Sequence, residues 1–401
     1  MTSPITALPP APPARPARRP WRGLTRFMPS ATLPRNLLLA IAIIVGIAVV
    51  LQVVGDFRAS QLVLLGSYGI AAMGLTLLTG LNGQISLGHG ALMAVGAYTT
   101  ALLLGTDDPL PFPVICVAAV LTTSVVGAIV GVAAARLHGP YLAGATLALA
   151  VALPGTALYF RDFLGGEQGL GVRAPRAPDA VSHVIFLITG KSVSPSAYQA
   201  YMAWVALAIT VFLLANLVRS RVGRTWRAVR DDEVAAELAG INLSRTRIQA
   251  FVVSAACAGL AGAMYAISVR LAAPSAFTIV LSLGLLAAIV LGGLGSMLGA
   301  VIGSAVIVFL PQLTTNLGST LGLDQTKAAQ IAPLVYGVVL VLVMLLAPAG
   351  LVGTVRTRLR DRRAAANPTS ADGAPRPAPG PDVPDPQTPR ATTPGAAEEA
   401  P

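Results

Sequence analysis

The stretch "GLNGQISLGHGALMAVGAY", residues 80–98, begins with loop-forming residues and continues as an apolar segment. It contains five glycines and one histidine. Inside a lipid bilayer, irregular backbone is tolerated only where protein or a water-lined cavity satisfies its N–H and C=O groups. The stretch therefore predicts an irregular junction between two membrane-spanning segments.

The composition of the whole chain agrees with a membrane protein. Of the 401 residues, 54% are hydrophobic and 11% are charged, whereas about a quarter of the residues of a soluble domain are charged. The net charge of +11 comes from short loops beside apolar segments, which indicates membrane topology and membrane lipid rather than a nucleic acid partner. Cys116 and Cys257 lie in apolar segments, so no disulfide framework is expected.

Apolar segments long enough to cross a bilayer, about 20 residues each, recur about ten times. They predict an all-α polytopic membrane protein with spans at 36–54, 61–80, 84–104, 112–135, 140–160, 201–219, 247–272, 278–293, 296–315 and 330–350. An even number of spans places both termini on one side. Most basic residues fall on that side, so the positive-inside rule predicts that both termini are cytoplasmic. A re-entrant segment within 61–104 would change this assignment.

The chain divides into three parts by composition. Residues 1–35 read as a disordered basic cytoplasmic arm, residues 36–353 as the transmembrane domain, and residues 354–401 as a basic, then Pro-rich, disordered cytoplasmic tail. The transmembrane domain carries a long cytoplasmic loop, 219–247, and a long extracytoplasmic loop, 161–200.

Small residues repeat every four positions in several predicted spans. Examples are Gly127 and Gly131, Ala255 and Gly259, and Gly295, Gly299 and Gly303. Small residues allow helix backbones to approach closely in a membrane. The repeats therefore predict helix packing and say nothing about a substrate.

No predicted span carries an acidic residue near its middle. Ion-coupled transporters and pumps usually place ionisable groups there, which argues against a secondary transporter and for an external source of energy. A membrane scaffold or receptor stays open as an alternative, but it gives no reason for the loop described next. No catalytic constellation and no metal-ligand cluster is predicted, so the chain is not expected to be an enzyme.

The cytoplasmic loop 219–247 contains a predicted helix of about nine residues. Asp231 or Asp232 can cap its start, Glu233 suits its first turn, and Gly240 can end it. Its apolar stripe consists of Val234, Leu238 and Ile241. So short a helix is marginal alone, so we expect it either to dock in a groove of a partner or to lie on the membrane surface.

Several motifs in order along residues 61–353 resemble one family. "AVRDDEVAAELAGIN" (228–242) resembles the coupling loop of ABC importer permeases. With it, "LHGPYLAGATLALA" (137–150), "GGEQGL" (165–170), "GGLGSMLGAVIGS" (292–304) and the opening stretch resemble the LivM-type permease subunits of the high-affinity branched-chain amino acid importers. Position 167 is acidic, where small or polar residues are expected.

The resemblance implies a type II-like ABC importer permease bundle in the bacterial cytoplasmic membrane. Its implied partners are a second, LivH-like permease, two cytoplasmic ABC ATPase subunits and an extracytoplasmic substrate-binding protein. The ATPase subunits would use ATP, and this chain would bind no cofactor. The implied cargo is branched-chain amino acids, with urea or short-chain amides as the alternative.

The resemblance also implies three sets of site residues. The ATPase-coupling set is Arg230, Asp231, Asp232, Glu233, Val234, Ala235, Ala236, Glu237, Leu238, Gly240 and Ile241. The translocation-pathway set is Asn82, Gly83, Gln84, Ser86, His89, Tyr141 and Thr146, with His89 one or two turns into the next helix; alternatively the junction is a cytoplasmic turn and His89 a core histidine. The binding-protein docking set is Glu167 and Gln168, unless that loop is merely solvated.

Overall fold

The computed structural model describes residues 32–137, 140–175, 177–189, 194–320, 325–346 and 350–365. The chain divides into two units, residues 1–354 and 355–401, close to the predicted boundary at 353. Most of the predicted disordered arm and tail lies outside the described residues. Where they are described, both are helical: α1 begins at Thr32, and α15 (Gly350–Ala365) continues past residue 354.

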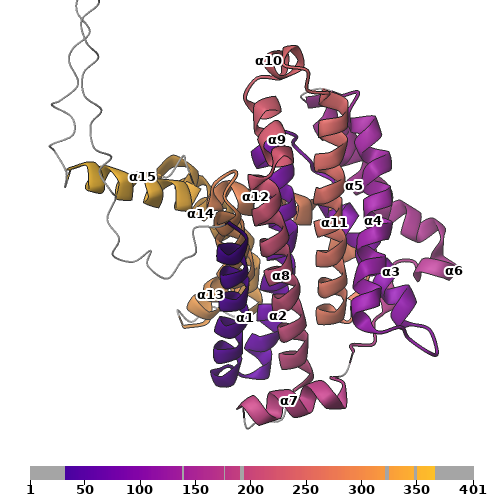
Figure 1. The fold of residues 1–401 in the computed structure, drawn as a ribbon. Helices are drawn as coiled ribbons and strands as arrows, with labels where there is room; N and C mark the ends of the chain where they lie inside the picture. The colour runs from indigo at the N-terminus through magenta and orange to yellow at the C-terminus, as the bar shows by residue number, and fades with distance from the viewer. Residues whose placement is uncertain are drawn as a thin grey trace, which may run out of the picture. The chain divides into compact units, whose positions relative to one another are not determined.

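Each predicted span corresponds to one helix of the first unit (Figure 1). These helices are α1 (Thr32–Val53), α2 (Asp56–Leu75), α3 (His89–Leu104), α4 (Phe112–Ala134), α5 (Pro140–Tyr159), α8 (Pro195–Arg219), α11 (Leu243–Val269), α12 (Ile279–Gly292), α13 (Met297–Thr320) and α14 (Gln325–Leu346). Within the described residues, eight helical segments are long and apolar enough to cross a membrane, and α3 is apolar but shorter. The chain is therefore an all-α polytopic membrane protein.

Helix α11 is the centre of the first unit, and it packs against α2, α3 and α4. The predicted small-residue repeats make these contacts. A Cβ on Gly127 of α4 would overlap the Ala255 side chain of α11, and a Cβ on Gly96 of α3 would overlap the Gly259 backbone. Close backbone approach thus replaces the hydrophobic drive that is missing in lipid.

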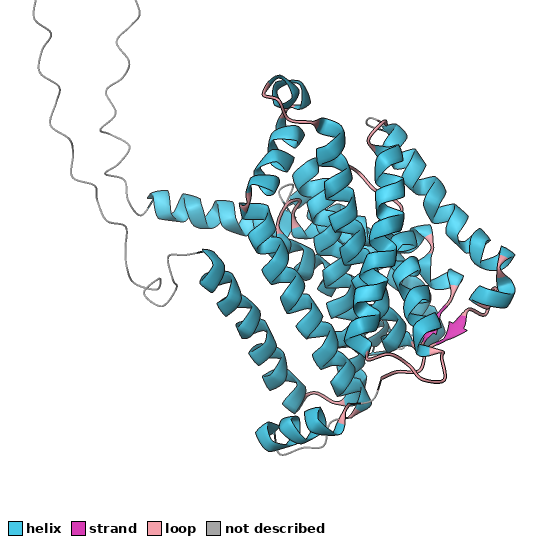
Figure 2. Ribbon diagram, turned by 45° about the vertical axis from the view of Figure 1, so that its right-hand side comes forward, coloured by secondary structure: helices cyan, strands magenta, loops and turns pink. Residues whose placement is uncertain are grey.

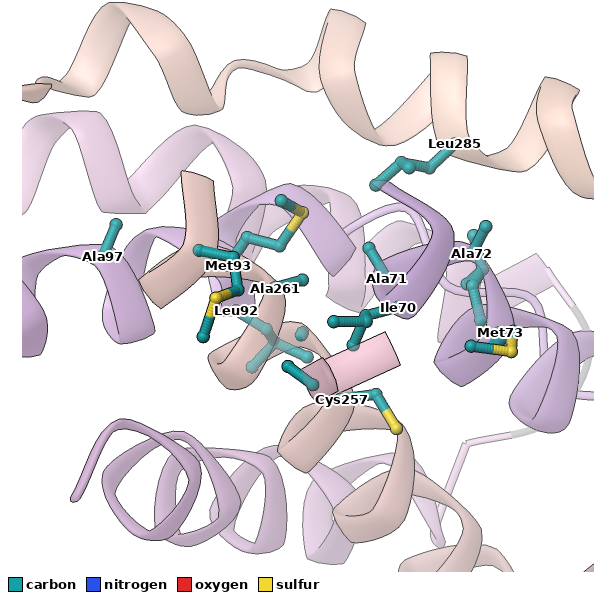
Figure 3. Packing of buried hydrophobic residues seen from close by; sticks show 14 of the residues in the cluster. Ile70, Ala71, Ala72, Met73, Leu92, Met93, Ala97, Cys257, Ala261 and Leu285 are labelled. Atoms are coloured by element: carbon teal, nitrogen blue, oxygen red, sulfur yellow. The ribbon is translucent and has the colours of Figure 1, made fainter. Parts of the chain in front are cut away.

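The core lies where α2, α3, α11 and α12 meet. Figure 3 shows Ile70 and Met73 from α2 beside Leu92 from α3, Cys257 from α11 and Leu285 from α12. All five side chains are buried. Cys257 and the half-buried Cys116 are both free thiols, as the sequence predicts.

The two ends of the bundle carry different short elements. At one end, α9 (Arg221–Asp231) leads into α10 (Glu233–Leu238), and at the other α7 (Asp179–Thr189) lies across the bundle (Figure 1). The short helix α6 (Arg161–Leu164) is followed by β1 (Leu170–Gly171), which pairs antiparallel with β2 (Leu271–Ala272) just after α11 (Figure 2). The 3-10 turn η2 (Pro274–Phe277) then leads into α12.

Candidate coupling and translocation site

The junction after α2 is an irregular segment inside the bundle. Helix α2 widens into a π-helix, η1 (Thr76–Leu81), and the chain then runs without regular structure until α3 begins at His89. The predicted helix start at residue 84 is therefore wrong by five residues, and His89 is the first residue of α3 rather than one or two turns into it. The glycines at 83 and 88 and the polar residues between them keep the segment out of the helix.

Hydroxyl groups from neighbouring helices satisfy the irregular backbone. The N–H of Leu87 donates to Oγ1 of Thr146 on α5 at 3.0 Å, and the N–H of Gly90 donates to Oγ of Ser282 on α12 at 2.9 Å. His89 lies near the backbone of Ala71, nine residues before Gly80 along α2 and η1, or about 13 Å of helix. The irregular segment therefore extends deep into the bundle, where only protein groups can satisfy it.

Most predicted pathway residues gather around this segment. Nε2 of Gln84 donates to Oδ1 of Asn82 at 2.7 Å, and Thr146 closes the segment from α5. The buried members of the set are Asn82, Gln84, Ser86, His89 and Thr146. Gly83 is exposed, and Tyr141 is 76% exposed and outside the buried cluster.

Because these residues are buried, a solute cannot contact them in this conformation. The hydroxyl of Ser86 and both ring nitrogens of His89 make no hydrogen bond of normal geometry within the described residues, although the ring of His89 lies close to the backbone of Ala71. Their side chains face protein from every side, so in this conformation they do not line an open route for a solute. A role in the pathway stays a prediction that would require another conformation.

The loop between α8 and α11 is more ordered than its sequence predicts. Asp232 caps α10, because its Oδ1 accepts the N–H of Ala235 at 3.0 Å, and Gly240 follows α10 with a φ of +83°. Both features agree with the predicted cap and stop. However, Asp231 ends α9 and Asp232 is extended, so α10 has six residues rather than about nine.

Two apolar residues of the predicted stripe on α10 are uncovered. Val234 is 68% exposed and Leu238 is 85% exposed, while Ile241 is half-buried beyond the helix. The opposite side of the helix packs inward through buried Ala236. The structure thus presents a small apolar surface on a helix that the chain itself does not cover.

Two arginines fix this loop to the bundle. Nη2 of Arg247, a buried residue of α11, lies 2.6 Å from Oε1 of Glu233 on α10. Nη1 of Arg230 on α9 donates to the carbonyl oxygen of Gly80 at the end of η1. Neither α9 nor the role of Arg247 was predicted from the sequence. The signal for α9 is the pair Trp226 and Val229, which are buried and spaced by about one turn.

Three segments meet around Arg230. Its side chain lies beside Gly83 and within 4.0 Å of the position that a Cβ on Gly295 would occupy. A Cβ on Gly80 would overlap the backbone of Gly295, which lies in the turn between α12 and α13. The loop between α8 and α11, the π-helical end of α2 and the α12–α13 turn are therefore in direct contact.

The predicted docking residues lie on a structured turn at the other end. Gly165, Gly166 and Gly169 all have positive φ angles, and the N–H of Gly169 bonds back to the carbonyl of Gly165. Glu167 and Gln168 are exposed at the tip of this turn. The residues that follow the turn form β1, and the pairing of β1 with β2 fixes the position of the turn on the bundle. Its docking role stays a prediction.

Comparison with known proteins gives one consistent result. Residues 58–347 match the family model described as branched-chain amino acid transport system / permease component. The chain is 31% identical to the high-affinity branched-chain amino acid transport system permease protein LivM of Escherichia coli K12, over 75% of this chain and 71% of the relative. It is 30% identical to LivM of Salmonella typhimurium, with 73% and 69% covered.

A second group of relatives is more distant. The chain is 26% identical to the high-affinity branched-chain amino acid transport system permease protein LivH of Escherichia coli K12, over 73% of this chain and 93% of LivH. No solved structure shows significant similarity to the chain.

Proposed function

The chain belongs to the family of branched-chain amino acid transport system permease components, and on that premise we propose that it is the membrane-spanning subunit of an ATP-driven importer. Its cargo would be branched-chain amino acids, which are the substrates named for its LivM and LivH relatives. The urea or amide alternative has no comparable support among these relatives. The importer would lie in the cytoplasmic membrane, with both termini in the cytoplasm.

The observation that carries this proposal is the exposed apolar surface on α10. Val234 and Leu238 stand out on a capped helix that two arginines tie to the bundle. A helix presented in this way suits docking into a groove of another protein. The partner would be an ABC ATPase, two of which would bind and hydrolyse ATP, so that this chain needs no cofactor.

The membrane-surface alternative for α10 is less well supported. The helix has only six residues and exposes two large apolar side chains, whereas helices that bind membranes this way usually bury a longer apolar face. Two apolar residues suit a small protein groove better. The remaining partners would be a LivH-like permease and an extracytoplasmic binding protein.

The contacts of the loop suggest how ATPase movement reaches the bundle. A displaced α10 would pull on α11 through Glu233 and Arg247, and α9 would pull on η1 through Arg230. The ATPase must contact two states of the loop differently for this to shift the equilibrium between them. Transport would then follow from a change in the packing of η1 and of the α12–α13 turn.

Co-purification and uptake test the proposal together. The chain is expressed with its partner permease, ATPases and binding protein, and uptake of labelled leucine and urea is measured in proteoliposomes containing ATP. We expect Val234→Asp plus Leu238→Asp to release the ATPase and abolish leucine uptake. Ala228→Asp, at an exposed position on α9, is the control. Unchanged uptake in the double variant, or uptake of urea but not leucine by the wild type, contradicts the proposal.

A further inference from the structure

The second half of helix α13 has two side chains with amide groups, Gln312 and Asn316, on one face. Phe309, Gln312, Leu313 and Asn316 are spaced at i, i+3, i+4 and i+7, so they share one side of the helix. This face opens on a cavity of about 650 Å³, whose opposite wall is formed by the first turns of α2. The residues of that wall are Phe57, Arg58 and Gln61.

The polarity of this cavity argues against a lipid-facing surface. Polar side chains in membrane spans face the bundle interior or a water-filled cavity, because hydrocarbon cannot satisfy them. Gln61 and Gln312 are half-buried and line the cavity, and Arg58 is exposed at its edge. Within the part of the chain that the structure describes, Arg58 makes no ion pair.

The cavity lies at the end of the bundle opposite the coupling loop. Arg58 is in the first turn of α2, whereas the far end of α2 continues through η1 to Gly80 and Arg230. Helix α13 starts beside Gly295, next to that same junction, and Phe309 lies twelve residues further on, about 18 Å along the helix. The cavity therefore opens on the extracytoplasmic half if α10 is cytoplasmic.

The residues that line the cavity match the carboxylate, the ammonium group and the side chain of an amino acid whose side chain is apolar. The Arg58 guanidinium can form paired hydrogen bonds with a carboxylate. The amide oxygens of Gln61 and Gln312 can accept from an ammonium group. Phe57, Phe309 and Leu313 offer apolar surface for a branched side chain, and the volume falls in the range of about 300–1,000 Å³ typical of small-molecule sites.

We propose that this cavity, rather than the irregular segment 82–88, is the extracytoplasmic site at which the permease first binds its cargo. The cargo is a zwitterionic amino acid with an apolar side chain. This inference rests on the proposed function, because it takes the cargo class from it. It assigns carboxylate recognition to Arg58, ammonium recognition to Gln61 and Gln312, and side-chain contact to Phe57 and Phe309. The partner permease would complete the cavity without filling it.

Cysteine accessibility tests whether water and cargo reach the cavity. Gln312→Cys is compared with Val125→Cys, an exposed apolar position midway along α4, in the complete importer in proteoliposomes. We expect a charged, membrane-impermeant thiosulfonate reagent to label Gln312→Cys and not Val125→Cys, and leucine supplied with the binding protein to slow that labelling. The wild-type chain, with its two native cysteines, serves as the blank. Equal labelling at both positions, or no effect of leucine, overturns the inference.

Arg58 variants test the assignment of the carboxylate. We expect Arg58→Gln to lower the rate of leucine uptake at least tenfold, Arg58→Lys to restore part of it, and ATPase co-purification to stay unchanged. Arg173→Gln, at an exposed position at the same end, should have no effect. If the wild type imports leucine and Arg58→Gln imports it equally fast, this inference fails alone. If the wild type imports no leucine, the proposed function fails.

Discussion

The guanidinium of Arg230 donates a hydrogen bond to the main-chain carbonyl of Gly80. This bond joins α9 to the π-helical end of α2. π-helical turns often mark functional sites, because the extra residue leaves backbone groups without their usual partners. Through this bond, α9 directly contacts the segment that leads into the bundle.

Loss of this bond should uncouple ATP hydrolysis from transport. We predict that Arg230→Ala leaves ATPase binding intact, because α10 is unchanged, and lowers leucine uptake per ATP hydrolysed by about tenfold, the equivalent of about 1.4 kcal/mol. Uptake and phosphate release are measured in the same proteoliposomes. Arg224→Ala, which removes only a hydrogen bond to the nearby carbonyl of Arg219, should leave the ratio unchanged. The account of Arg230 is wrong if both variants behave alike.

The ion pair between Glu233 and Arg247 should determine the order of α10. Arg247 is buried and Glu233 is 49% exposed, so we expect Glu233→Gln to cost about 1–2 kcal/mol, less than loss of a fully buried pair. Amide hydrogen exchange over residues 233–238 should become about tenfold faster. Glu237→Gln, at an exposed position on the same helix, is the control. Unchanged exchange in Glu233→Gln would show that the pair does not hold the helix.

Thr146 should stabilise the irregular segment by accepting the N–H of Leu87. Thr146→Val keeps the shape of the side chain but leaves that N–H buried without a partner, at a cost of about 1–3 kcal/mol. We expect a lower thermal unfolding midpoint of the purified chain. Thr156→Val removes an exposed hydroxyl that bonds only to Leu153 of its own helix and should shift the midpoint little. Equal midpoints would mean that the segment does not depend on α5.

Close approach of α3 and α11 should make Gly96 intolerant of a side chain. A Cβ there would overlap the backbone of Gly259, so we expect Gly96→Ala to destabilise the purified chain by about 1–3 kcal/mol. Gly144, in α5, has open space around it, so Gly144→Ala should be neutral or slightly stabilising. Detergent-solubilised protein followed by thermal unfolding gives both values. A harmless Gly96→Ala would show that the two helices are not tightly packed.

Much of the fold follows from the sequence because lipid imposes strict rules. Apolar length, small-residue repeats and turn residues predicted the spans, the packing faces and the caps, including Asp232 and Gly240. Those features depend on local chemistry and on the cost of bare backbone in hydrocarbon. The helix start at His89 was missed because residues 84–88 are apolar enough to resemble a span. In the structure the N–H of Leu87 bonds instead to distant Thr146, and the N–H of Gly90 to Ser282.

The candidate site was less predictable because it depends on contacts between distant segments. Nothing local to Arg247 shows that it reaches Glu233, and nothing near Arg230 shows that it reaches Gly80, 150 residues earlier. Asn82, Gln84 and Ser86 looked like pathway residues because they are polar at a membrane break. All three are buried, and burial depends on contacts between segments that are distant in the sequence, which no local pattern encodes.

On the proposed function, the bundle itself has no source of energy and moves solute only when ATPase subunits act on α10. The most direct measurement is leucine accumulation in proteoliposomes, comparing the chain alone under a proton or sodium gradient with the complete importer containing ATP. We expect no accumulation by the chain alone. We expect accumulation by the complete importer, and we expect it to stop without ATP or with Val234→Asp plus Leu238→Asp. Gradient-driven accumulation by the chain alone would contradict it.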